Sequence, residues 1–127
     1  MKKIMIVDDV DISNFIMKKM ISKVSGEYEL HDFTLPAQAI ESIEEINPDL
    51  IFLDVNMPVI NGWEFLELMK QRNCKTDVYV LTSSTSELDL QRSRHFNNVK
   101  NFLVKPIKLQ TLSDILQNVP SDCFVVH

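Results

Sequence analysis

The sequence contains few cysteines, and their positions exclude the common cysteine-based architectures. Only Cys74 and Cys123 occur among its 127 residues, and they form no Cys-x-x-Cys motif. Small secreted proteins depend on several paired cysteines, whereas thiols in the cytosol stay reduced. Neither cysteine lies near a plausible pair of histidine ligands for a metal. We therefore expect a cytoplasmic protein in which both cysteines are structurally incidental.

Long hydrophobic runs and concentrated positive charge are also missing. No uncharged stretch approaches the roughly 18 residues needed to cross a membrane, and the first residues do not resemble a signal peptide. The net charge is −5, and the 13 Lys and Arg residues form no block longer than a pair. Such a chain is expected to bind neither nucleic acid nor an anionic membrane.

Apolar segments of strand length alternate with segments of helical periodicity. Strands, each followed by a helix, are predicted at residues 3–7, 27–33, 50–53, 78–81 and 101–104. Strands joined by helices run parallel, and strands that are apolar on both faces need helices on both sides. The predicted fold is therefore α/β: a flavodoxin-like, doubly wound, five-stranded parallel sheet of order 2-1-3-4-5, flanked by five helices. We expect one domain over residues 1–127, with residues 121–127 as a short tail.

The buried faces of the helices follow from the spacing of apolar residues. The first helix is predicted to bury residues that recur every four positions: Ile12, Ile16, Met20 and Val24, with Phe15 beside them. The polar fourth helix is expected over residues 85–96, with Asn97 or Asn98 as a left-handed cap. The last helix is predicted to bury Leu109, Leu112, Leu116 and Val119.

Polar side chains follow four of the five predicted strands. Asp8 and Asp9 follow the first strand, Asp54 the third, Thr82 the fourth and Lys105 the fifth. The carboxyl ends of parallel strands meet at one edge of the sheet, where ligands bind, so these side chains are expected to converge. Taken singly, each has an ordinary interpretation, and Asp8 or Asp9 could simply cap the first helix. Matching polar residues at four separate strand ends favour a shared site instead.

Three carboxylates in one place require a cation. They raise each other's pKa unless positive charge lies among them, and one ammonium group is not enough. Oxygen ligands with room for water suit Mg²⁺. The cluster has no histidine, which argues against zinc, and its spacing is not that of an EF-hand calcium loop. A metal, a lysine, a hydroxyl and one central carboxylate together suit phosphoryl transfer to that carboxylate.

Four motifs, in order, resemble the receiver domain of two-component response regulators: VDD at 7–9, LDVNMPVINGWEFL at 53–66, VLTSS at 80–84 and FLVKP at 102–106. The resemblance covers essentially the whole chain and is closest to stand-alone, chemotaxis-regulator-like receivers. It implies that Asp54 is the phosphoacceptor and that the donor is a sensor histidine kinase or a histidine phosphotransfer protein. It implies a monomeric signalling protein that promotes its own phosphorylation and dephosphorylation, is not an enzyme, and acts on a downstream protein target.

The same resemblance implies a metal site and two tuning positions. Asp9, Asp54 and the Asn56 backbone carbonyl would bind Mg²⁺ directly, with Mn²⁺ as a possible substitute, and Asp8 would act mainly through water. In similar proteins the positions of Asn56 and Ser84 tune the lifetime of the phosphoryl group.

The resemblance also implies a switch. Thr82 and Lys105 would contact the phosphoryl group, and the Lys105-Pro106 peptide would be cis. Thr82 would then move and Phe102 would turn inward, which changes the surface of the fourth helix, fifth strand and fifth helix. Direct binding of a target and onward relay of the phosphoryl group both remain open.

The fourth helix departs from the family's pattern, and Trp63 offers a probe of the site. The fourth helix lacks the family's alanine-rich sequence and carries a polar face, which puts the usual partner surface in doubt: Gln91, Arg92, Arg94 and His95. Trp63 begins the third helix close to the loop after Asp54, so its fluorescence is expected to respond to the site.

Two alternative functions use the same residues. DVDIS at 9–13 matches the nucleophile motif of haloacid-dehalogenase-like phosphatases, with Asp9 as nucleophile and Asp11 as acid/base. That fold needs a second acidic pair late in the chain, but only Asp114 and Asp122 follow Asp89. The other alternative is a docking module of receiver fold that is never phosphorylated.

Overall fold

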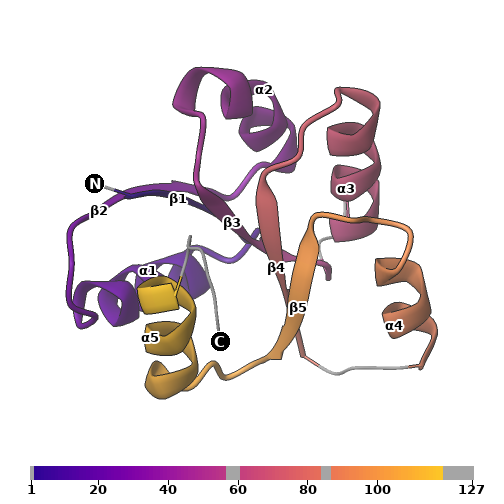
Figure 1. Cartoon of the computed structure of the whole chain (residues 1–127). Coiled ribbons are helices and arrows are strands. Elements are labelled where there is room, and N and C mark those ends of the chain that lie inside the picture. Colours follow the sequence, from indigo (N-terminus) through magenta and orange to yellow (C-terminus); the bar gives the residue numbers. More distant parts are fainter. Residues whose placement is uncertain (1, 57–60, 84–86, 119–127) are drawn as a thin grey trace.

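The computed structural model describes residues 2–56, 61–83 and 87–118 and confirms the predicted fold. Five strands form one parallel sheet in the order β2-β1-β3-β4-β5 (Figure 1). The strands are β1 (Lys2–Val7), β2 (Tyr28–Phe33), β3 (Leu50–Asp54), β4 (Asp77–Thr82) and β5 (Val99–Val104). The helices are α1 (Asp11–Ser22), α2 (Pro36–Ile46), α3 (Gly62–Gln71), α4 (Glu87–Ser93) and α5 (Leu109–Asn118).

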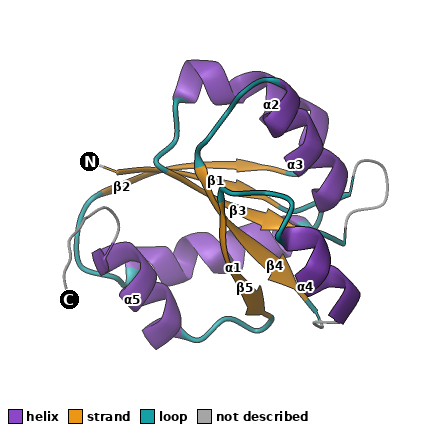
Figure 2. Ribbon diagram, turned by 45° about the vertical axis from the view of Figure 1, so that its right-hand side comes forward, coloured by secondary structure: helices purple, strands orange, loops and turns teal. Residues whose placement is uncertain are grey.

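The central strand β3 is buried at every position and separates two hydrophobic cores. Side chains alternate across a strand, so Ile51 and Leu53 pack with residues of α2 and α3, whereas Leu50 and Phe52 pack with residues of α1 and α5. Helices therefore form a layer on each face of the sheet (Figure 2). Within the described ranges, no helix has the length and hydrophobicity needed to cross a bilayer.

The predicted buried face of α1 is wrong for Ile12, Phe15 and Ile16, whereas Met20 packs against the core and Val24, just after the helix, is buried as predicted. The helix buries Asn14, Met17 and Ile21, whereas Ile12 is 60% exposed and Ile16 is 52% exposed. Each residue turns a helix by about 100°, so a face one residue further along points in a different direction. The segment carries apolar residues at helical spacing on both faces, and periodicity alone could not choose between them.

The ends of α4 and α5 also differ from the prediction. Helix α4 ends at Ser93, and the next three N–H groups each bond to a carbonyl three residues back. Neither Asn97 nor Asn98 has a positive φ; in the described chain that conformation occurs at Asn47 and Asn73 among non-glycine residues. In α5, Leu112 and Leu116 are buried as predicted, Leu109 is exposed, and Val119 lies outside the described residues.

The packing of α1 can be tested with two isoleucines of the same helix. Ile21→Ala is expected to lower the free energy of unfolding by about 2–5 kcal/mol, because it empties a fully buried site. Ile12→Ala is the matched control and should change it by only about 0.5 kcal/mol. Urea unfolding of both variants measures the difference, and equal losses would contradict the observed face.

Candidate metal and phosphoryl site

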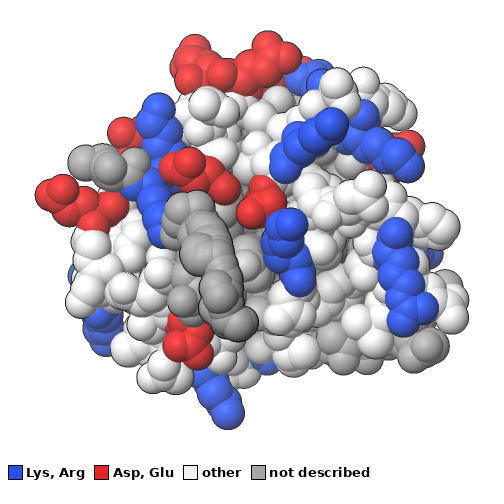
Figure 3. Space-filling model, in the orientation of Figure 1, with Lys and Arg blue, Asp and Glu red and all other residues white. Residues whose placement is uncertain are grey.

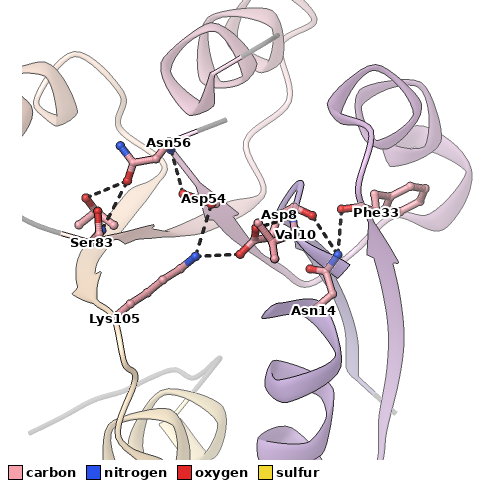
Figure 4. A network of polar contacts seen from close by, with 9 residues as sticks. Asp8, Val10, Asn14, Phe33, Asp54, Asn56, Ser83 and Lys105 are labelled. Carbon is pink, nitrogen blue, oxygen red and sulfur yellow. Dashed lines mark hydrogen bonds and ion pairs between the residues drawn. The ribbon is translucent and has the colours of Figure 1, made fainter. Parts of the chain in front are cut away.

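The site lies where four strands end at one edge of the sheet. Asp8 follows β1, Asp54 ends β3, Thr82 ends β4 and Lys105 follows β5. The strand register brings these ends level, because Val7 pairs with Leu53, Asp54 with Leu81, and Thr82 with Val104. Figure 4 shows the Lys105 side chain extending across the edge toward Asp8 and Asp54.

Three carboxylates crowd into this edge. Oxygens of Asp8, Asp9 and Asp54 lie within 4.8 Å of one another. Asp8 and Asp54 are almost fully buried, and Asp9 is the most exposed of the three. Backbone N–H groups hold the two buried carboxylates, since Val10 N donates to Asp8 Oδ1 at 3.0 Å and Asn56 N donates to Asp54 Oδ1 at 2.8 Å.

The interpretation of Asp8 or Asp9 as a helix cap is wrong. The N-cap position of α1 is Val10, and no side-chain capping hydrogen bond forms there. The Asp8 carboxylate instead accepts from the loop that precedes the helix and from Lys105. The adjacent aspartates are therefore directed toward the edge of the sheet.

Lys105 joins two of the acidic residues. Its Nζ donates to Asp8 Oδ2 at 2.8 Å and to Asp54 Oδ2 at 3.4 Å. Burial disfavours the charged ammonium group, but the hydrogen bonds and charges of the two aspartates outweigh this and raise the pKa of Lys105. The group is thus firmly cationic at neutral pH. The Lys105-Pro106 peptide is cis, as expected.

Burial disfavours the ionised form of Asp54. Burial raises its pKa, and the charge of Asp8 adds to the increase, against the hydrogen bond from Asn56 N and the charge of Lys105. The positive charge of one lysine therefore does not fully offset the negative charge of the three carboxylates. Additional positive charge beside Asp54 would stabilise its ionised form.

Asn56 and Thr82 complete the edge, while Ser84 lies outside the described residues. The Thr82 hydroxyl donates to Asn56 Oδ1 over 3.5 Å, and the Ser83 N–H lies at the same distance from that oxygen (Figure 4). Hydrogen bonds of this length are weak. Asn56 is exposed, whereas Thr82 is buried.

Comparison with known proteins identifies the family. The model of the response regulator receiver domain matches residues 4–117. The chain belongs to this family. The receiver is 28% identical over 120 residues to the chemotaxis protein CheY of Thermotoga maritima, covering 93% of this chain and 97% of that protein. A structure of the Vibrio cholerae chemotaxis protein CheY4 matches with a TM-score of 0.81 and 30% identity, covering 94% of this chain and 98% of the other.

Other relatives are much longer. The receiver is 29% identical over 122 residues to the hybrid signal transduction histidine kinase C of Dictyostelium discoideum, and the match covers 91% of this chain. It spans 10% to 51% of the length of the first curated relatives it matches. Receiver domains of this family interact with histidine kinases and with downstream targets. The roles of individual residues, and a single domain over 1–127, stay predictions.

Asn14 is a residue of this receiver that the sequence patterns did not reveal. Its side chain is buried in α1, and Nδ2 donates to the backbone carbonyls of Asp8 at 3.0 Å and Phe33 at 3.3 Å. It thereby ties the turn after β1 to the end of β2 (Figure 4). The available signal was a single amide among apolar residues at helical spacing, since asparagine is a poor helix former.

Gly62 also shapes the site. A Cβ at this position would lie 2.5 Å from Val55 Cα and 2.9 Å from the Asp54 carbonyl oxygen, so only glycine permits this approach of α3 to the end of β3. Asn61 and Glu64 then fix the start of the helix with a reciprocal capping box. The local sequence therefore places α3 tightly against the strand that carries Asp54.

Phe102 packs in an aromatic cluster. Its ring centroid lies 5.9 Å from that of Trp63, which stacks on Phe96 at 6.4 Å. The guanidinium of Arg92 lies 5.8 Å from the Trp63 ring. Trp63 therefore links α3 with β5 and with the segment at the end of α4.

The raised pKa of Asp54 predicts a stability effect. Burial makes the ionised form of this carboxyl group less favourable in the folded chain than in the unfolded chain, so its ionisation destabilises the fold at pH values above its raised pKa. This cost is lost as the pH falls from the raised pKa toward the ordinary pKa of the unfolded chain. Without divalent metal at neutral pH, Asp54→Asn should raise the free energy of unfolding, and the difference should shrink with acidification. Urea unfolding in EDTA across pH measures this.

The control for this measurement removes a carboxylate from the surface. Glu45 is exposed on α2, so Glu45→Gln should show no comparable, pH-dependent gain. A destabilised Asp54→Asn protein at neutral pH would contradict the electrostatic description of the site.

Proposed function

We propose that this receiver accepts a phosphoryl group on Asp54, in a Mg²⁺-dependent reaction, from a phosphohistidine of a sensor histidine kinase or a histidine phosphotransfer protein. The observation that carries the proposal is the position of the buried Asp54 carboxylate at the carboxyl edge of the sheet, close to Lys105 and to the carboxylates of Asp8 and Asp9. The protein would act as a signalling component that promotes its own phosphorylation and dephosphorylation, and not as an enzyme on a separate substrate.

The donor set fits Mg²⁺. Three carboxylates offer oxygens within 4.8 Å, and burial together with the charge of Asp8 raises the pKa of Asp54. Asp9, Asp54 and the Asn56 carbonyl would hold the ion, with Asp8 acting through water, and Mn²⁺ could replace it. When bound, the ion would neutralise charge on the transferring phosphoryl oxygens.

Three side chains of the receiver would take part in the transfer itself. An Asp54 carboxylate oxygen attacks phosphorus, the phosphorus–nitrogen bond breaks, and its electron pair returns to the imidazole of the donor. Lys105, 3.4 Å from Asp54 Oδ2, is close enough to pair with a phosphoryl oxygen. The Thr82 hydroxyl, which faces the same edge, would donate a hydrogen bond to another.

The face of α1 beside the site supports a protein donor. Ile12, Phe15 and Ile16 are each more than half exposed. A neighbouring apolar pocket of about 320 Å³ extends from α1 to the segment after β5, with Asp8 and Lys105 among its lining residues. Exposed apolar surface of this kind marks a protein-binding site, and here it would bring a phosphohistidine directly over Asp54.

The phosphatase alternative fits the geometry less well. It needs Asp11 beside Asp9, but Asp11 lies in the exposed first turn of α1, and the acidic cluster in the described residues consists of Asp8, Asp9 and Asp54. It also gives no role to Asp54 and Lys105. The alternative of a docking module without phosphorylation predicts that no covalent product forms.

Incubation with acetyl phosphate and Mg²⁺ tests the proposal. The protein should gain the mass of one phosphoryl group, Asp54→Asn should gain none, and Asp9→Asn should react more slowly while still modifying Asp54. Intact-mass spectrometry with mapping of the site gives the readout. Labelling of Asp54→Asn would favour the phosphatase, and no labelling of the wild type would favour the docking module.

The switch and its output form the second part of the proposal. Thr82 would move toward the phosphoryl group, and Phe102 would turn inward and change the surface of α4, β5 and α5 for a downstream target or for relay. Because Phe102 touches Trp63, this movement should alter the indole environment.

Trp63 fluorescence provides a direct measure of this switch. Saturation with Mg²⁺ and beryllofluoride, a phosphoryl mimic, should change the emission of the wild type and leave that of Asp54→Asn unchanged. Identical emission before and after saturation of the wild type would show that the movement does not reach α3.

A further inference from the structure

Two adjoining hollows, together called the groove, lie between α3 and the segment at the end of α4. The hollows, of about 410 and 300 Å³, share His95 and Phe96 among their lining residues. The first reaches Trp63 near the start of α3, and the second reaches Lys70 and Lys100 at the opposite end. The groove therefore follows the length of α3 on the side that faces α4.

Aromatic rings form the floor of this groove. Trp63 and Phe96 stack with their ring planes 26° apart, and both are only partly buried. The Nζ of Lys70 lies 5.9 Å from the Phe96 ring centroid, and Arg92 covers part of the Trp63 ring. Partly exposed Trp and Phe with neighbouring cations are the residues that most often dominate binding energy at protein interfaces.

The groove also concentrates the positive charge of an acidic protein. The hollow at the Lys70 end is lined by three lysines, Lys70, Lys75 and Lys100, and by one acidic residue, Asp77, although the whole chain has a net charge of −5. In Figure 3, blue side chains lie over the side formed by α3 and α4, and most of the visible red ones lie elsewhere. Within the lining, Asp77 offsets Lys100 at 3.6 Å, and Glu64 and Glu67 lie toward the start of α3.

We propose that the groove between α3 and α4 binds an acidic segment of a partner protein, with an apolar side chain of that segment against Trp63 and Phe96. The carboxylates of the segment would lie along Lys70, Lys75 and Lys100, which line one hollow of the groove. This surface differs from the exposed face of α1, which lacks the stacked pair of Trp63 and Phe96.

Selection from a phage-displayed library of random linear peptides tests this proposal. The unphosphorylated receiver in EDTA serves as the target, so the outcome does not depend on phosphoryl transfer to Asp54. We expect the enriched peptides to be rich in Asp and Glu around one or two of Phe, Trp and Leu. Their binding should raise or quench Trp63 fluorescence and should weaken with added salt.

Charge-reversal variants of the receiver test where the selected peptides bind. The double variant Lys70→Glu/Lys100→Glu should weaken binding about tenfold or more, roughly the effect of 1.4 kcal/mol. Lys18→Glu/Lys19→Glu on α1 makes the same change in net charge away from the groove and should alter affinity by less than about twofold. Both pairs are solvent-accessible, so the variants are expected to fold.

Three results would overturn the proposal. They are a failure to enrich any peptide, the enrichment of peptides without acidic residues, and equal weakening of peptide binding by the two double variants. A normal mass gain with acetyl phosphate alongside such a result would reject the groove and leave the proposed phosphorylation of Asp54 intact.

Discussion

The ion pair between Lys105 and the two buried aspartates is the constraint on which the carboxyl edge depends. Asp8 and Asp54 are almost fully buried, and their carboxylate oxygens lie within 4.8 Å of each other. Like charges this close repel strongly in a medium of low polarity. Lys105 reaches both from a strand at the far side of the sheet, and backbone N–H groups hold the remaining oxygens. The negative charge of the cluster is not fully offset, as the raised pKa of Asp54 indicates, so further positive charge at the edge would stabilise the ionised carboxylates.

The hydrophobic interior fixes the register of the strands, and the register places Lys105 beside Asp8 and Asp54. From Leu50 to Leu53 the central strand has no polar side chain, and its two faces anchor different helical layers. A slip of one residue would exchange the two cores and move Asp54 away from Lys105. Asn14 adds a polar constraint between α1, β1 and β2. Apolar packing thus determines the positions of the charged groups.

Strand-based features could be predicted from the sequence, because strand ends in a parallel sheet have a defined place in space. Asp8, Asp54, Thr82 and Lys105 were found in this way, although they are far apart in the chain. The face of α1 could not be predicted, since Met17 and Ile21 compete with Ile12 and Ile16 at the same spacing. The contact of Trp63 with Phe102 and the gathering of cations near α3 depend on tertiary packing, which sequence position does not reveal.

The exposed face of α1 and the groove between α3 and α4 lie on different sides of the carboxyl edge, and they differ in chemistry. The α1 side exposes aliphatic and aromatic groups beside Asp8 and Lys105, so a protein bound there would reach the carboxylates directly. The α3–α4 side meets the site through Gly62, which lies against Asp54 and Val55, and through the contact of Trp63 with Phe102. Its groove is lined by lysines at one end and by Arg92 at the other. A donor and a target could therefore occupy the protein at the same time without competing. If Phe102 moves in the proposed switch, its contact with Trp63 would carry the change to the start of α3 and to the groove.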